Sequence, residues 1–178
     1  NIVIMLLIIL GGIGFLTWED FYTNKFKFKR YRMQSKVILI TTAILIIAPA
    51  VFFFACDFGN LPAGKRLLAS VFQSVTTRTA GFNTEDLSLM TEAGKAVMIL
   101  LMLIGGSPSS TAGGMKTTTF AVLILNALAT FRSREDAGAF GRRFDGQVIK
   151  NAATIAMLYF MLFFFGGITI SVYEGLPV

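Results

Sequence analysis

Four long apolar segments alternate with polar connections along the chain. Residues 2–18, 37–54 and 149–173 are apolar runs, and residues 93–131 form a fourth run that is interrupted in its middle. About 20 apolar residues cross a hydrocarbon core of ~30 Å at ~1.5 Å per residue, so each run predicts a segment that spans or enters a membrane. Pro49 predicts a kink in the second run, which membrane helices tolerate when a neighbour satisfies the freed carbonyl.

A shorter apolar helix is predicted over residues 62–75, between the second and fourth runs. At roughly 18 Å it is too short to cross the core, but it can enter the membrane and stop halfway. The polar stretch TTRTAGFNT, residues 76–84, then returns the chain to the same side. An amphipathic helix lying on the membrane surface is the other interpretation. The apolar face consists of Leu67, Leu68, Val71, Phe72 and Val75.

The return after this helix has the composition of a cation-binding loop. A helix C-terminus carries about half a negative charge, which favours a cation, and irregular backbone at membrane depth must be buried in protein or line a watery path. Gly81 supplies the backbone freedom for a tight return. Arg78 would repel a cation, so we expect it to point behind the loop and pair with an acid. We predict that four carbonyls replace the water of a dehydrated monovalent cation, those of Thr79, Ala80, Gly81 and Phe82.

The fourth run is interrupted by GGSPSSTAGG, residues 105–114. Glycine costs ~1 kcal/mol and proline ~3 kcal/mol in a helix interior, so the pattern predicts two half-helices, 93–104 and 117–130, joined by an irregular loop. Such a loop at membrane depth lines a cavity, and below a filter it can obstruct permeation. A charge there is a functional candidate. The predicted gating residues are Gly105, Gly106, Ser107, Pro108, Ser109, Ser110, Thr111, Ala112, Gly113, Gly114 and Lys116.

Two other interpretations of this loop stay open. Its glycines can serve close helix packing alone, as we expect for residues 11–14 and 166–167. The loop also resembles a phosphate-binding G-x-x-x-x-G-K pattern, but Met115 separates Gly114 from Lys116 and no strand is expected before it.

The basic residues report topology. Eleven of the sixteen Lys and Arg lie in two linkers, residues 25–36 and 131–150, which the positive-inside rule places in the cytoplasm. A basic amphipathic surface helix is the other interpretation of the first linker. Because topology explains the net charge of +6, we expect no nucleic-acid partner. Four acids then face outward and either concentrate cations or are ordinary solvated side chains: Asp57, Glu85, Asp86 and Glu92.

Composition excludes most catalytic chemistry. The 178 residues include one cysteine and no histidine, so zinc, Cys-His and Ser-His-Asp sites are not expected, and we predict a protein that is not an enzyme. A hydrophobic fraction of 54% indicates a multi-pass membrane protein.

Two motifs carry a family resemblance. SVTTRTAGFNT at 74–84, followed by LMLIGGSPSSTAGGMKTTTFAVL at 101–123, resembles the Trk/Ktr/HKT superfamily of potassium-transport subunits, most nearly the membrane subunits of Ktr systems. The resemblance implies an all-α integral membrane fold of M1–P–M2 pore-loop repeats, with a re-entrant pore helix, a filter loop and a broken M2 helix. Gly81 matches the filter glycine and residues 105–114 match the intramembrane gating loop.

The resemblance also implies how the chain is organised. Residues 1–36 would be the second membrane helix of repeat two with a cytoplasmic linker, and residues 135–178 a linker with the first membrane helix of repeat four. We expect the chain to be a fragment of a longer subunit. Residues 37–134 would be the complete third repeat, with M1 at 37–54, the pore helix at 62–75, the filter at 76–84 and the broken M2 at 93–131.

The implied function is potassium uptake through a carbonyl-lined filter. K⁺, or Na⁺, would be the permeant ion, held by backbone carbonyls with no covalent cofactor. The implied partners are membrane lipid, a second copy of the subunit in a homodimer, and a cytoplasmic nucleotide-binding regulatory subunit of the RCK type. The implied location is the cell membrane of a bacterium, in a multi-pass arrangement.

Two other functions compete. A secondary transporter would bind a solute at its broken helix, but it predicts a second broken helix in an inverted repeat, and no other segment is expected to show one. A membrane scaffold would leave the filter-like glycine without a purpose. Selectivity between potassium and sodium depends on four such loops, of which the sequence contains one.

Overall fold

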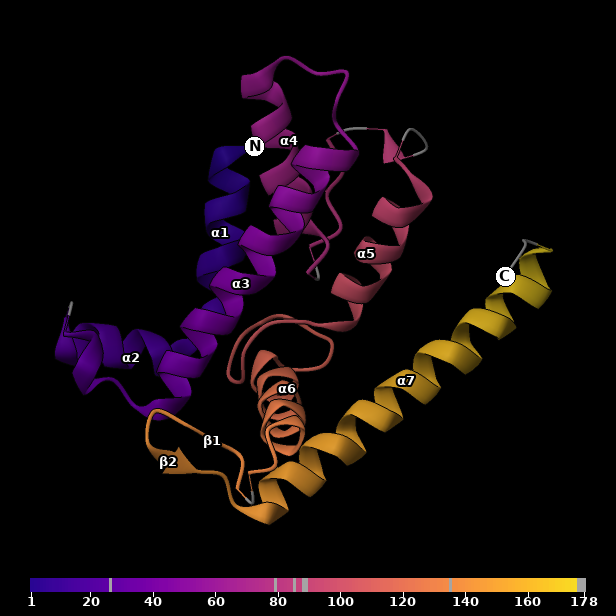
Figure 1. The fold of residues 1–178 in the computed structure, drawn as a ribbon. Helices are drawn as coiled ribbons and strands as arrows, with labels where there is room; N and C mark the ends of the chain where they lie inside the picture. The colour runs from indigo at the N-terminus through magenta and orange to yellow at the C-terminus, as the bar shows by residue number, and fades with distance from the viewer. Residues whose placement is uncertain (26, 79, 85, 88–89, 135, 176–178) are drawn as a thin grey trace. The chain divides into compact units, whose positions relative to one another are not determined.

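The chain folds mostly into helices, as the apolar pattern predicts. The computed structural model describes residues 1–178 except 26, 79, 85, 88–89, 135 and 176–178. They divide into two compact units, residues 1–121 and 122–178, with the boundary inside one helix. In chain order the elements are α1 (Ile2–Ile13), α2 (Phe15–Asn24), η1 (Phe28–Arg30), α3 (Met33–Cys56), α4 (Ala63–Thr76), α5 (Glu92–Leu103), α6 (Thr117–Phe131), β1 (Gly138–Ala139), β2 (Arg142–Arg143) and α7 (Gly146–Glu174) (Figure 1).

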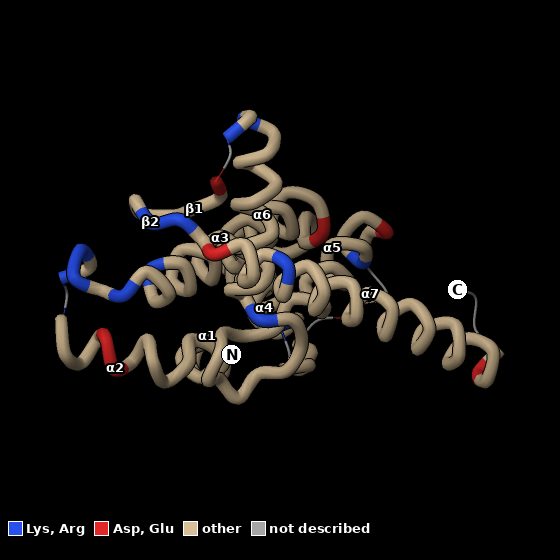
Figure 2. Tube along the Cα trace, turned by 90° about the horizontal axis from the view of Figure 1, so that it is seen from below, with Lys and Arg blue, Asp and Glu red and all other residues tan. Residues whose placement is uncertain are grey.

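Among the described residues, α3 and α7 are long and apolar enough to cross a membrane. They extend the predicted runs 37–54 and 149–173 by a few residues at each end. The predicted half-helices are α5 and α6, separated by residues 104–116. Figure 2 shows that the helices carry few charged residues, whereas Lys and Arg gather on the linker after α2 and around the β1–β2 hairpin. The fold class is therefore that of an integral membrane protein built from helices.

The first apolar run is not one continuous helix, and the expectation that no segment besides the fourth run is broken is wrong. It bends by 91° between α1 and α2. Gly14, with φ 84° and ψ 148°, makes the bend, a conformation that residues other than glycine rarely adopt. The indole N–H of Trp18 donates to the Leu10 carbonyl across the bend at 3.1 Å. The chain therefore has a second broken helix, which the sequence analysis did not expect.

Helix α4 lies inside the first unit and not on its surface. Figure 1 shows it beside α1 and α3, and all three pairs of these helices are in contact. Phe72 and Val75 pack with Met5 of α1, and Ala69 belongs to the core shared by α3 and α5. Its uncharged polar side chains are buried too, Gln73 being only 1% exposed. The surface-helix interpretation is therefore wrong, although Leu67, predicted on the apolar face, is exposed.

Helix α4 also supplies a hydrogen-bond donor next to Pro49, the kink residue of α3. Pro49 has no N–H, so the carbonyl of Leu45, four residues earlier, has no partner within the helix. The buried Ser74 hydroxyl lies 3.3 Å from this carbonyl and 2.7 Å from that of Ile46. Both distances are within hydrogen-bond range, so a side chain of the neighbouring helix supplies the donor that proline removes.

The ends of α3 are fastened by charged side chains. At its C-terminus, the Arg66 guanidinium donates to the Phe54 carbonyl at 2.7 Å and lies over the Phe54 ring. A cation is favourable at this end of a helix. At its N-terminus, the buried Asp20 of α2 accepts from the Ser35 hydroxyl at 2.6 Å and from the Arg32 amide at 3.0 Å. These contacts hold α2 and α4 against the two ends of α3.

The described part of the first basic linker contains only the short turn η1 before α3 begins. The alternative interpretation of this linker as an amphipathic surface helix is therefore not supported. In the second unit, β1 and β2 pair as an antiparallel hairpin, and Asp145 caps α7 by accepting from the Gln147 amide at 3.1 Å.

Candidate functional site

The predicted filter stretch forms a tight turn around the last residue of α4. The amides of Ala80 and Gly81 both donate to the Thr76 carbonyl at 3.1 Å. The Thr76 hydroxyl donates to the Phe82 carbonyl at 2.7 Å. Gly81 has φ 71°, and a Cβ built there meets no atom within 4 Å, so backbone conformation and not crowding favours glycine.

The carbonyls of this turn differ in whether they accept hydrogen bonds. The Phe82 carbonyl is held by Thr76, whereas those of Ala80 and Gly81 accept no hydrogen bond from the described residues. Thr79, the first predicted filter residue, lies outside the described residues. Thr76 braces the turn from both its carbonyl and its hydroxyl, and the sequence analysis did not single it out. A threonine at the end of a short buried helix is the signal that points to it.

Arg78 is buried next to the turn but does not meet its expected partner. It is 6% exposed, and its Nε has no hydrogen-bond partner among the described residues. None of the ion pairs in the described structure involves it. The predicted pairing with an acid is thus not seen among these residues. The side chain instead borders a cavity of about 170 Å³, lined by Leu7, Ile8, Gly11, Gly12, Arg78, Ala80, Gly106, Thr111 and Ala112.

This cavity joins two parts of the predicted site to α1. Ala80 comes from the filter turn, and Gly106 and Ala112 come from the interrupted part of the fourth run. Gly11 and Gly12 come from the end of α1. The structure therefore brings the loop between α5 and α6 next to the predicted filter turn, and α1 adds a wall that the sequence did not predict.

Residues 104–116 fold back on themselves before α6 begins. The Gly105 amide donates to the Met115 carbonyl at 2.9 Å, and the Met115 amide donates to the Leu103 carbonyl at 3.1 Å. The Thr117 amide donates to the Gly106 carbonyl at 3.0 Å. These bonds bring the end of α5 and the start of α6 together across an irregular excursion of the chain.

Glycine is required inside this loop for close approach. A Cβ at Gly105 would lie 1.6 Å from the Gly113 carbonyl oxygen, and one at Gly106 would lie 2.6 Å from the Ala112 Cβ. Gly114 has φ 73°. These glycines let the loop pack on itself, which differs from helix packing alone. At Gly166 and Gly167, which were expected to serve helix packing, a built Cβ meets no atom of a neighbouring element within 4 Å among the described residues.

Lys116 closes the loop with a main-chain contact. It is half-buried, and its ammonium donates to the Ala112 carbonyl at 2.7 Å. A helix, α5, precedes this loop. The strand that a phosphate-binding loop needs is therefore replaced by a helix, and the phosphate-loop interpretation is wrong.

Acids that were predicted to face outward have structural partners in the described part of the chain. Oδ1 of Asp57 accepts from the Thr91 amide at 2.8 Å and from its hydroxyl at 2.7 Å, while Thr91 caps α5 by accepting from the Gly94 amide. Glu92 pairs with Lys95 at 2.8 Å. Asp57 therefore joins the end of α3 to the start of α5. Of the other two acids, Asp86 also has an interaction, and Glu85 lies outside the described residues.

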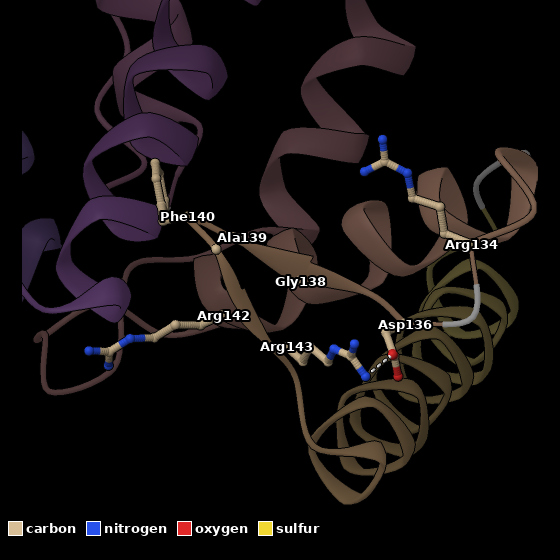
Figure 3. A pocket seen from close by; sticks show the side chains of 8 residues that line it. Arg134, Asp136, Gly138, Ala139, Phe140, Arg142 and Arg143 are labelled. Atoms are coloured by element: carbon tan, nitrogen blue, oxygen red, sulfur yellow. Dashed lines mark ion pairs between the residues drawn. The ribbon is translucent and has the colours of Figure 1, made fainter.

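The second unit has a pocket of its own, on the basic hairpin (Figure 3). Figure 3 shows Arg143 directed toward Asp136, with which it forms an ion pair at 2.5 Å. Arg134 and Arg142 extend away from this pair. The pocket is lined by Arg134, Asp136, Gly138, Ala139, Phe140, Gly141, Arg142 and Arg143.

The long apolar helices α3 and α7, together with a short buried helix and an adjacent broken helix, define a helical integral membrane protein. Comparison with known proteins agrees. The family model described as TrkH, cation transport protein, matches residues 1–176. The chain belongs to this family, within the Trk/Ktr potassium-transporter superfamily, and is a multi-pass protein of the cell membrane.

Individual relatives give the same result. The chain is 36% identical over 180 residues to the potassium/sodium uptake protein NtpJ of Enterococcus hirae, covering 98% of this chain and 40% of the relative. It is 33% identical over 183 residues to the Ktr system potassium uptake protein B of Bacillus subtilis, covering 99% and 41%. The chain thus spans about two fifths of the length of these relatives. Both relatives are named as uptake proteins.

Proposed function

We propose that this chain contributes one filter loop and one gate to a potassium-uptake subunit. The relatives named above are potassium or sodium uptake proteins. The observation that carries the proposal is the cavity shared by Ala80 of the filter turn and Gly106 and Ala112 of the loop. It supports an ion path that passes from the turn to the loop.

Backbone carbonyls are the ion ligands in this proposal. Oxygens of Ala80 and Gly81, unpartnered among the described residues, can replace the hydration shell of K⁺ or Na⁺. Helix α4, 14 residues or about 21 Å long, enters the membrane and directs its C-terminal carbonyls toward the ion. Thr76 keeps the turn rigid, and Thr79 and Phe82 complete the proposed filter stretch.

The loop of residues 105–114 with Lys116 is the proposed gate. Gly106, Thr111 and Ala112 of this loop line the same cavity as Ala80 of the turn, where the docked loop would obstruct an ion. Arg78 adds a positive charge to the same cavity, and a buried guanidinium repels a potassium ion. In this proposal, the docked loop and Arg78 together close the ion path.

The secondary-transporter alternative gains one observation, the second break at Gly14. That alternative requires an inverted repeat. Under the positive-inside topology, α1–α2 and α5–α6 both run from the outside to the cytoplasm. The two breaks then belong to parallel repeats, which favours the pore-loop proposal.

Regulation is proposed from the cytoplasmic side. The relatives that belong to Ktr systems are named as parts of a system. We propose that the full subunit forms a homodimer and binds a nucleotide-binding regulatory subunit of the RCK type. The basic linker after α2 and the basic hairpin are the proposed contacts in the cytoplasm.

Rubidium flux through the full-length subunit in liposomes tests the proposal. The wild-type subunit should take up rubidium, and shortening the loop within residues 107–114 should raise the rate several-fold because the obstruction is removed. Size-exclusion chromatography in detergent checks folding. Flux at the wild-type level through a folded, shortened variant would contradict the gating role.

A further inference from the structure

The bend at Gly14 and the loop of residues 104–116 satisfy each other's main-chain groups. The last carbonyls and first amides of helices lack partners within the helix. Here the Gly12 carbonyl of α1 accepts from the Ser107 amide at 3.0 Å and from the Ser107 hydroxyl at 2.7 Å. The Phe15 amide of α2 donates to the Ser109 carbonyl at 3.2 Å. The loop thus supplies both partners that the break in the helix removes.

The fit between bend and loop is close. Ser107 is fully buried, at 0% exposure. A Cβ at Gly14 would lie 2.4 Å from the Pro108 carbonyl oxygen and 2.7 Å from the Ser107 hydroxyl oxygen. The φ of 84° at Gly14 is also one that other residues rarely adopt. A single glycine therefore permits both the bend and the docked position of the loop.

An unbroken helix would satisfy the same carbonyl in a different way. Helical pairing joins the carbonyl of residue i to the amide of residue i+4, so in a straight helix the Gly12 carbonyl accepts from the Leu16 amide. The buried acceptor is then bonded in both arrangements. Two arrangements that each satisfy the backbone meet the requirement for a two-state element.

We infer that the α1–α2 bend and the loop form one switch. In the closed state α1 and α2 are bent and the loop is docked on Gly12 through Ser107. In the open state α1 and α2 join as a straight helix and the loop is released from the ion path. The inference rests on the proposed gating function, and it assigns Ser107 the role of a positioning residue.

Helix α2 connects this switch to the cytoplasmic linker. Its first residue, Phe15, contacts the loop, and its last, Asn24, leads directly into the basic residues that follow. Asp20 fastens α2 to the start of α3. A cytoplasmic partner that binds the linker and moves α2 would therefore act on the loop through the bend.

The Ser107→Ala variant of the full-length subunit tests the docked state. Removing one neutral hydrogen bond should shift the equilibrium toward the released loop by roughly 2- to 10-fold, with a matching rise in rubidium flux. Ser70→Ala is the matched control, because Ser70 is equally buried and donates to a main-chain carbonyl, that of Arg66, within its own helix. The control should leave the flux unchanged.

A distance across the bend gives an independent measurement. Spin labels replace Leu6 and Tyr22, which are 52% and 89% exposed, after the exposed Cys56 is changed to Ser. With the 91° bend the two Cα atoms are roughly 17 Å apart, and in a straight helix they are roughly 24 Å apart. Ser107→Ala should increase the share of molecules with the longer distance.

Gly14→Ala provides a second route to the open state. Its methyl group displaces the loop while the Ser107 hydroxyl remains, and it disfavours the bend. It should raise the rubidium flux and also the share of molecules that show the longer distance. Higher flux with an unchanged distance in either folded variant would overturn the switch, as would an unchanged distance at unchanged flux. A wild-type subunit that takes up no rubidium would contradict the proposed function, and the distance measurement would still test the switch.

Discussion

Single buried polar residues set the positions of the helices in the first unit. Asp20, 3% exposed, accepts hydrogen bonds from the Ser35 hydroxyl and the Arg32 amide, and lies 3.5 Å from the Arg32 guanidinium. Glu19 next to it pairs with the same arginine at 3.1 Å, but both side chains are more than half exposed. Burial distinguishes the two acids, because exposed ion pairs contribute little and buried charged groups are costly to leave unpaired.

Replacing Asp20 with Ala should destabilise the full subunit by roughly 2–4 kcal/mol, because the Ser35 hydroxyl and the Arg32 amide lose a charged acceptor. Glu19→Ala should cost about 1 kcal/mol or less. Thermal unfolding in detergent, followed by size-exclusion chromatography, measures both variants. Equal losses would show that the Asp20 contacts do not fasten α2 to α3.

Residue patterns predicted the turn after α4 but not all of its supports. Gly81 was predicted from the need for a tight return, and its positive φ confirms that need. Thr76 was missed because its two roles depend on where the chain goes after α4 ends. The acid expected beside Arg78 was inferred from charge alone, and burial next to a cavity is what the structure shows instead.

At the scale of elements, α3 and α4 are coupled through Pro49. The Ser74 hydroxyl lies within hydrogen-bond range of the Leu45 carbonyl that Pro49 leaves without an amide partner. Ser74→Ala should therefore cost about 1 kcal/mol when Pro49 is present. In a Pro49→Ala background the new amide satisfies the carbonyl, and the cost should fall.

A double-mutant cycle on the full subunit measures this coupling as the difference between the two losses of stability. We expect a coupling free energy of roughly 0.5–1.5 kcal/mol. Strictly additive effects of the two substitutions would mean that Ser74 does not replace the missing donor.

Element prediction succeeded where the signal was local. The apolar runs and the glycine-proline interruption predicted α3, α4, α5, α6 and α7 within a few residues. The bend between α1 and α2 could not be predicted in the same way, since its sequence is apolar enough to continue as one helix. Ser107, which donates to the Gly12 carbonyl at this bend, lies 95 residues beyond Gly12 in the chain. Contacts at such separation are invisible to local pattern.

At the scale of the whole molecule, we propose that this chain supplies a part of a larger ion path. Helices α3, α4, α5 and α6 occur in the order that we propose for one pore-loop repeat, and the family match covers residues 1–176. The chain spans about two fifths of the length of its relatives. A carbonyl filter needs donors from all sides of the ion, and we propose that one side is the turn at Ala80 and Gly81.

The proposed filter role of the turn at Gly81 is best tested by the relative permeability of potassium and sodium in the Gly81→Ser variant of the full-length subunit. Serine at φ 71° is strained, so the turn should relax and its carbonyls should move away from the ion. We expect the preference for potassium over sodium to fall while the protein remains folded. An unchanged permeability ratio in the folded variant would contradict the assignment of this turn as a filter.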